Sequence, residues 1–131
     1  MAFLRGNYME KSAKEVLEKS GFKVEENVKS PSGSTIDILA SCGAVHLVIE
    51  LKSGPVSTLD VSTLNASIAD LRLPEERKVF IFTDSITSGS AVTLSEKLRI
   101  NILKFTPEGL AKTVKQVIEE TSRSGQVSCR E

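Results

Sequence analysis

The chain has 131 residues, the length of one domain with a single apolar core, and no apolar stretch approaches the roughly 20 residues that cross a bilayer. With 40% apolar and 26% charged residues and no Trp, it has the composition of an ordinary globular protein whose core consists mainly of Val, Ile and Leu. The 17 basic and 17 acidic residues give a formal net charge of zero, which counts against a protein that attracts nucleic acid through its total charge but leaves room for a local basic surface.

The first half of the chain predicts one helix followed by three strands. Apolar residues recur at helical spacing over residues 7–20, and Asn7 and Glu10 have the spacing of a capping box at the helix start. Residues 30–34 have the composition of a turn. The strands are expected over residues 22–28, 35–41 and 44–52.

The second half predicts alternating helices and strands. The helix over residues 58–71 would place Leu59 on its apolar stripe. The continuous apolar run 79–83 is typical of a strand that is covered on both faces. Thr106 and Pro107 predict the start of the last helix. The remaining elements are a helix over residues 89–98 and a strand over residues 100–105.

The resulting order, α-β-β-β-α-β-α-β-α, predicts an α/β fold with a mixed central sheet and helices on both faces. No internal repeat and no linker divides the chain. We therefore expect a single domain over residues 1–121 and a polar C-terminal tail over residues 122–131.

Two carboxylates and one amine form the most informative pattern. The strand 44–52 ends in Glu50-Leu51-Lys52, and Asp37 lies on the preceding predicted strand. Side chains alternate along a strand, so Glu50 and Lys52 should point to the same side. Such a cluster binds a hard divalent cation through oxygen and places an amine beside it, which is the chemistry of metal-dependent phosphodiester cleavage.

The chain carries further motifs in a recognisable order. They are Arg5-Gly6-Asn7, Glu10, Gly21-Phe22, Ser30-Pro31-Ser32-Gly33-Ser34, Asp37-Ile38-Leu39-Ala40 and Ile49-Glu50-Leu51-Lys52. This arrangement resembles the PD-(D/E)XK nuclease superfamily, which has the restriction-endonuclease-like fold, although Ile36 stands where the name motif has Pro. The front half resembles archaeal Holliday-junction resolvases, and the back half, with a strand ending in Phe82-Thr83, resembles Mrr-type endonucleases.

The resemblance implies roles for five residues of the site. Asp37 and Glu50 would ligate Mg²⁺, for which Mn²⁺ can substitute, and the Leu51 carbonyl would add a main-chain ligand. Glu10 would complete the acidic cluster through water. Lys52 would orient or deprotonate the attacking water and stabilise the developing charge.

The resemblance also implies contacts with DNA. Ser32 or Ser34 would contact the scissile phosphate, and Asn65 is the nearest candidate for the helical Gln of Mrr-type proteins. Arg5 and Lys29 are among the basic residues that could bind the DNA backbone.

The expected function is a Mg²⁺-dependent DNA endonuclease, selective for branched DNA as a resolvase is and acting as a homodimer with two active sites. The alternatives are an Mrr-like duplex endonuclease or a nuclease module guided by a partner. A rival from another class is a non-catalytic DNA-binding or assembly module with the same fold.

The cysteines and the start of the chain bear on its location. Cys42 and Cys129 are far apart and lack metal-ligand spacing, so we expect free thiols in a reducing compartment. With His46 as the one histidine, a zinc site is not expected. The first residues lack the apolar core of a signal peptide, so we expect a soluble, cytoplasmic, DNA-associated protein that does not bind membranes.

Overall fold

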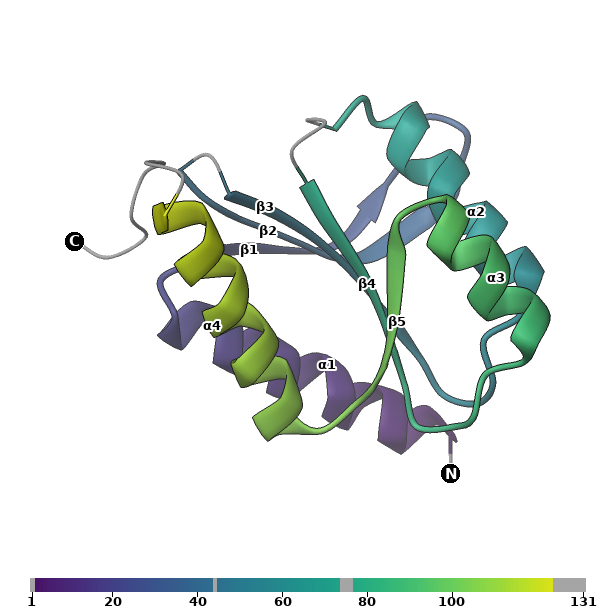
Figure 1. The fold of residues 1–131 in the computed structure, drawn as a ribbon, viewed down its shortest axis with the longest axis horizontal. Coiled ribbons are helices and arrows are strands. Elements are labelled where there is room, and N and C mark those ends of the chain that lie inside the picture. The colour runs from purple at the N-terminus through teal and green to yellow at the C-terminus, as the bar shows by residue number, and fades with distance from the viewer. Residues whose placement is uncertain (1, 44, 74–76, 124–131) are drawn as a thin grey trace.

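The computed structural model describes residues 2–43, 45–73 and 77–123, and for residues 2–7 and 121–123 it describes the backbone alone. Its helices are α1 (Ala2–Lys19), α2 (Thr58–Asp70), α3 (Gly89–Lys97) and α4 (Pro107–Arg123), and its strands are β1 (Lys23–Lys29), β2 (Thr35–Cys42), β3 (Val45–Lys52), β4 (Arg77–Thr83) and β5 (Ile100–Lys104) (Figure 1). All nine predicted elements are present in the predicted order.

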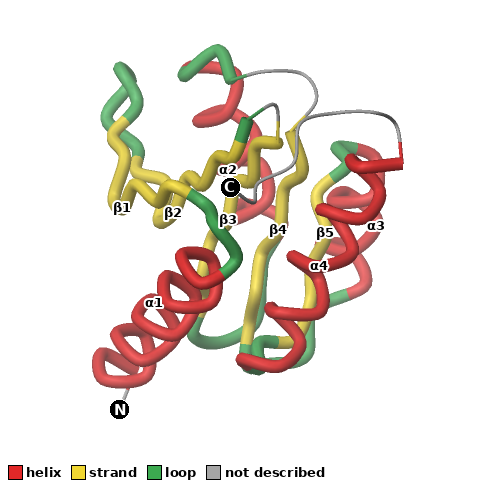
Figure 2. The backbone as a smooth tube through the Cα atoms, turned by 90° about the vertical axis from the view of Figure 1, so that its left-hand side faces the viewer, coloured by secondary structure: helices red, strands yellow, loops and turns green. Residues whose placement is uncertain are grey.

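The strands form one mixed sheet in the order β1-β2-β3-β4-β5, which Figure 2 shows from left to right. β1, β2 and β3 are antiparallel neighbours, whereas β3, β4 and β5 run parallel. The parallel half follows from the two crossovers through α2 and α3, because parallel strands need a long connection between them. The α/β class with a mixed central sheet is therefore confirmed.

Helices cover both faces of this sheet, and each face has its own apolar core. α1 and α4 lie on one side, and α2 and α3 lie on the other (Figure 1). The alternation of side chains along β3 places Leu47 and Ile49 in the first core and Val48 in the second. Burial on both faces explains why the central strands read as continuous apolar runs.

The first helix begins earlier than the sequence predicted. α1 starts at Ala2, so Asn7 lies inside the helix and cannot be its N-cap, and Glu10 does not lie in the first turn. The expected capping box was therefore wrong. The helix continues through Gly6, because a single interior Gly costs only about 1 kcal/mol, which is too little to end a helix that packs against a core.

The apolar stripe of α2 also differs from the expectation. Leu59 is 72% exposed, whereas Val61, Leu64 and Ile68 are buried between the helix and the sheet. Leu59 lies in the first turn, two residues after the N-cap Ser57, and it is nine positions before Ile68, about two and a half turns, so it faces away from the buried stripe. At the other end of the chain, α4 continues to Arg123, so residues 122 and 123 belong to the helix rather than to the expected tail.

The expectation for Cys42 was also wrong. Cys42 is disulfide-bonded, and none of the described residues is a free cysteine; Cys129 lies outside the described residues. Cys42 ends β2 at a half-buried position, and its separation from the other cysteine along the sequence was no guide to whether it is bonded. Cys42 thus gives no support to a reducing compartment. In the described part of the chain, no helix combines the length and apolarity needed to cross a bilayer.

Candidate active site

Asp37 and Glu50 lie where the hairpin of β2 and β3 stops pairing. The ladder runs as far as the pair Ile38–Ile49, and a carboxylate follows on each strand. The main-chain N–H of Asp37 donates to Oε1 of Glu50 at 2.9 Å, and the N–H of Leu51 donates to Oδ2 of Asp37 at 2.8 Å. Each carboxylate thus binds the main chain of the other's strand, which fixes the two side chains beside one another.

A local break in β2 accompanies this arrangement. Ile36 and Ile38 are both buried and two positions apart, yet they belong to different apolar cores, so the alternation of the strand changes at Asp37. On the neighbouring strand β1, Asn27 has a left-handed φ of 53°, and the register of β1 with β2 omits this residue and Asp37. Asp37 therefore lies at an irregular point of the sheet that the sequence pattern did not indicate.

The electrostatics of the pair favour a bound cation. Burial, followed by the charge of Asp37 and, to a smaller extent, that of Asp60, raises the pKa of Glu50 to about 8. Burial also raises the pKa of Asp37, although the hydrogen bond from Leu51 opposes the shift. Two ionised carboxylates at such a site repel each other, and a proton or a cation relieves that repulsion.

The donor set fits Mg²⁺ or Mn²⁺. Carboxylate oxygens are the ligands of hard divalent cations, and Mg²⁺ commonly takes one or two carboxylates and keeps several waters. Across residues 2–43, 45–73 and 77–123, no group of three or more His, Cys, Asp or Glu residues is placed to hold a metal ion. Further ligands would thus be oxygens of water, of the main chain or of a substrate phosphate.

Lys52 lies two residues after Glu50 on β3, and its ammonium pairs with Asp60, a residue that the sequence motifs did not single out. Its Nζ is 3.5 Å from Oδ2 of Asp60, and the side chains of Lys52 and Asp60 are partly exposed. Asp60 also completes the capping box of α2, because its carboxylate accepts from the N–H of Ser57 at 2.8 Å and its own N–H donates to the Ser57 hydroxyl at 3.1 Å. The spacing Ser57-x-x-Asp60 was the signal that could have placed this acid at a helix start.

The loop after Lys52 is fastened to the end of β4. Lys52 pairs with Thr83 in the parallel register, and the chain then turns at Gly54, whose φ is 105°. The N–H of Gly54 donates to Oδ1 of Asp84 at 2.9 Å, and the Thr83 hydroxyl donates to the Gly54 carbonyl. These bonds restrict the backbone next to Lys52, so the end of β4 supports the site.

Glu10 lies near the site but is engaged with β1. The amide nitrogen of Asn27 donates to Oε2 of Glu10 at 3.5 Å. Burial raises the pKa of Glu10, the contact with Glu26 adds to the shift, and the charge of Asp37 adds more. Glu10 is therefore within electrostatic reach of Asp37, while its role in the metal's water shell stays a prediction.

The serines of the β1–β2 turn bind to one another and to α2. The Ser34 hydroxyl hydrogen-bonds with those of Ser30 and Ser67, and the Ser32 N–H donates to Oδ2 of Asp70 at 2.8 Å. These bonds fix the turn at the end of β2 that carries Asp37. Ser32 is exposed and Ser34 is partly buried, so Ser32 is the more accessible of the two to a ligand.

The other residues predicted to contact DNA are spread around the same end of the sheet. Lys29 is exposed at the end of β1, beside Thr35 at the start of β2, and Asn65 is half-buried on α2. The backbone of Arg5 lies in α1, and its side chain is outside the described part.

The raised pKa of Glu50 predicts how stability depends on pH. An unfolded Glu ionises near 4.5, whereas the folded protein holds this proton up to about pH 8. The folded state binds more protons in that window, so this contribution to stability is fully present below about pH 4.5 and is lost as the pH rises to about 8. Glu50→Gln lacks the titration, and its Tm relative to wild type should rise across the window by several degrees, since about 1 kcal/mol corresponds to about 4 °C.

Thermal melts of both proteins in metal-free buffer across this pH range measure the difference directly. Groups that do not interact with Glu50 titrate alike in both proteins and cancel in the comparison. A constant Tm difference between Glu50→Gln and wild type would contradict the buried carboxyl pair.

Comparisons with known proteins show the fold. No family model matches the chain, and no curated protein matches it. Among solved structures it is similar to AF1548, a protein of unknown function, with 19% identity over 89% of this chain and 78% of the other and a TM-score of 0.59. It is also similar to EndoMS in a complex with double-stranded DNA, with 23% identity over 72% of this chain and 40% of the other and a TM-score of 0.57.

A repair endonuclease from Pyrococcus abyssi is similar as well, with 19% identity over 70% of this chain and 41% of the other and a TM-score of 0.51. The chain thus spans about two fifths of the length of the two endonucleases that it resembles. The likeness confirms the restriction-endonuclease-like fold that the sequence motifs predicted.

Proposed function

We propose, from the restriction-endonuclease-like fold and the geometry of its carboxyl pair, that this chain is a metal-dependent DNA endonuclease that hydrolyses phosphodiester bonds. The observation that carries the proposal is the reciprocal contact of Asp37 and Glu50, with Lys52 two residues further along β3. Oxygen ligands and an amine at one strand end match the needs of phosphate chemistry.

The side chains of the site would have two roles: two carboxylates would bind the ion, and the amine would act on the attacking water or on the developing charge. Asp37 and Glu50 would hold the ion, and their bonds to the main chain of β2 and β3 keep them in place before substrate arrives. The ion would supply positive charge to the phosphate and lower the pKa of water. Lys52, partly exposed and oriented by Asp60, would direct its ammonium to the attacking water or to the developing charge.

Two supporting roles complete the proposed site. The Leu51 carbonyl belongs to the same strand segment as Glu50 and would provide a main-chain oxygen to the ion. Glu10, whose pKa is raised by burial and by its acidic neighbours, would bind a water of the metal rather than the metal itself.

For the substrate, branched DNA is our first proposal, because the front motifs follow the order seen in Holliday-junction resolvases. Cleavage of paired strands at a junction would require a homodimer with two sites. Duplex DNA is the second, and the complex of EndoMS with double-stranded DNA favours it. Either substrate implies a protein that acts where DNA is, inside the cell.

A non-catalytic module with the same fold is the rival proposal. It would have no need of two carboxylates buried beside each other, an arrangement that costs stability near neutral pH. A thermal melt with and without Mn²⁺ separates the two readings, because an ion that binds the folded state raises the Tm.

We expect cleavage of DNA in Mg²⁺ or Mn²⁺ and none in a chelator. Four-way junction, duplex, flap and single-stranded DNA are incubated side by side with wild type and with Asp37→Asn as the matched inactive protein. Preference for the junction supports the resolvase reading, and preference for linear duplex supports the second. Absence of metal-dependent cleavage of every substrate would contradict the proposed function.

A further inference from the structure

The outer edge of β5 presents a row of main-chain groups to solvent. Within the described residues, β5 has β4 as its one neighbouring strand. The N–H of Phe105 donates to the carbonyl of Thr83 on β4 at 2.8 Å. Because main-chain groups alternate sides along a strand, those of Ile100, Ile102 and Lys104 point away from β4.

The opposite edge of the sheet is protected, and the β5 edge is not. β1 reads Lys-Val-Glu-Glu-Asn-Val-Lys, and the left-handed Asn27 interrupts its pairing. Charged side chains and irregular backbone are the usual means of preventing edge-to-edge pairing. β5 reads Ile-Asn-Ile-Leu-Lys, with one charge at its end and no break. The β5 edge can therefore pair with a further strand, whereas the β1 edge resists such pairing.

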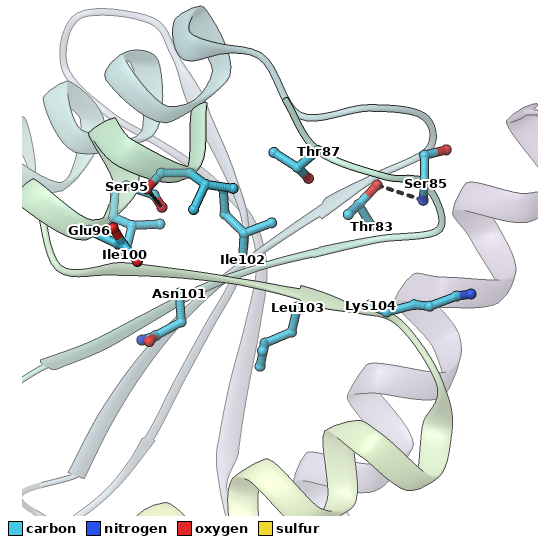
Figure 3. A pocket seen from close by; sticks show the side chains of 11 residues that line it. Thr83, Ser85, Thr87, Ser95, Glu96, Ile100, Asn101, Ile102, Leu103 and Lys104 are labelled. Atoms are coloured by element: carbon cyan, nitrogen blue, oxygen red, sulfur yellow. Dashed lines mark hydrogen bonds between the residues drawn. The ribbon is translucent and has the colours of Figure 1, made fainter. Parts of the chain in front are cut away.

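A groove of about 410 Å³ runs along this edge, between β5 and α3 (Figure 3). All five residues of β5 line it, together with three residues of α3 and the end of β4 with its loop. Apolar side chains are exposed beside it: Val92 of α3 is 38% exposed, and Ile86, between two lining residues of the loop, is 92% exposed. A groove beside an open strand, bordered by exposed apolar groups, is suited to an added strand.

The two charged residues that line the groove have opposite signs. Figure 3 shows Glu96 of α3 at one end, near Ile100, and Lys104 at the other end. A strand that enters antiparallel therefore needs a basic residue near its C-terminal end, beside Glu96. β5 itself has this pattern, because Lys104 is its last residue.

We propose that the occupant of this groove is β5 of a second copy of the chain, paired antiparallel about Ile102. Ile102 would then lie opposite its own counterpart, and Ile100 opposite Lys104 of the other copy. Each such pair exchanges two main-chain hydrogen bonds, and all the groups needed already point outward. The pairing brings Lys104 of each copy to Glu96 of the other, and it joins two five-stranded sheets into one.

The proposal goes beyond the proposed function and does not rest on it. The interface can be measured without DNA, metal or catalysis, so a failure here and a failure of the nuclease assay are distinguishable. Antiparallel pairing of the two β5 strands also places the two-fold axis of the dimer perpendicular to the sheet. The faces covered by α2 and α3 in the two copies then lie on the same side.

Charge reversal at the two ends of the groove tests the interface. Sedimentation velocity of the whole chain over a concentration series should show a dimer for wild type. Lys104→Glu should raise its dissociation constant by about tenfold or more, because two attractive contacts become repulsive, and Glu96→Lys should do the same. The double variant Glu96→Lys/Lys104→Glu should restore the dimer.

Two further variants provide a charge control and a test of the main-chain pairing. Lys112→Glu makes the same charge change on the exposed face of α4, outside the groove, and should leave the dimer unchanged. Lys104→Pro removes an outward N–H at an exposed edge position that tolerates Pro, and should dissociate the dimer while a thermal melt shows the fold intact. A monomeric wild type, or a dimer that neither reversal weakens, would overturn the proposal and leave the edge for a different occupant.

Discussion

Asp37→Asn and Glu50→Gln should each abolish metal-dependent DNA cleavage without unfolding the protein. Each change removes a charged oxygen and keeps the size of the side chain, and the new amide oxygen can still accept the main-chain bond from Leu51 or Asp37. A bound divalent ion contributes several kcal/mol of charge stabilisation, so we expect a loss on the order of 10³-fold in rate or more.

Three measurements on purified variants establish the cause of that loss. Single-turnover cleavage gives the rate, a melt with added Mn²⁺ reports ion binding, and a melt without metal reports the fold. Glu119→Gln, an exposed change on α4, is the matched control and should behave as wild type. Cleavage by Asp37→Asn at the wild-type rate would show that these carboxylates do not hold the metal.

Lys52→Ala should lower the cleavage rate by about 10²–10³-fold with little loss of DNA affinity. Lys52 lies two residues after Glu50 on β3 and pairs with Asp60, and its ammonium would act on charge that develops during the reaction. Rates at saturating DNA, together with binding measured in Ca²⁺, separate the two effects. Parallel losses in binding and in rate would instead make Lys52 a simple phosphate anchor.

Asp60→Asn is the informative companion of this variant. Asn can still accept the N–H of Ser57 and so keep the cap of α2, but the ion pair with Lys52 is lost. If Asp60 positions the ammonium, the rate should fall by a smaller factor than in Lys52→Ala, and combining the two changes should add little further loss. A full additional loss in the double variant would mean that Asp60 acts independently of Lys52.

The proximity of Asp37 and Glu50 could be predicted from the sequence. A turn follows Cys42, and the alternation of apolar residues sets the register of β2 on β3, so both carboxylates were expected at one end of the hairpin. The exchange of hydrogen bonds between them was not predictable. It depends on the break of alternation at Asp37, which no residue type in β2 announces.

Features that depend on the docking of helices could not be predicted. The contact between Asp60 and Lys52 requires α2 to place its first turn over the end of β3, and helical periodicity gives the face of a helix but not its position along a strand. Leu59, by contrast, could have been excluded from the core, because it lies about half a turn out of phase with Ile68, and it is exposed. For Cys42, the pairing depends on which segments approach each other in space.

The hydrogen bonds of the carboxyl pair link its integrity to the local dynamics of the hairpin. The amides of Asp37 and Leu51 are held by side chains rather than by the opposite main chain. Fraying of the strand ends would therefore separate the two carboxylates before the rest of the sheet opened. Solvent exchange of these two amide protons, which a bound cation would slow, would follow the opening and closing of the site in a protein that is not turning over.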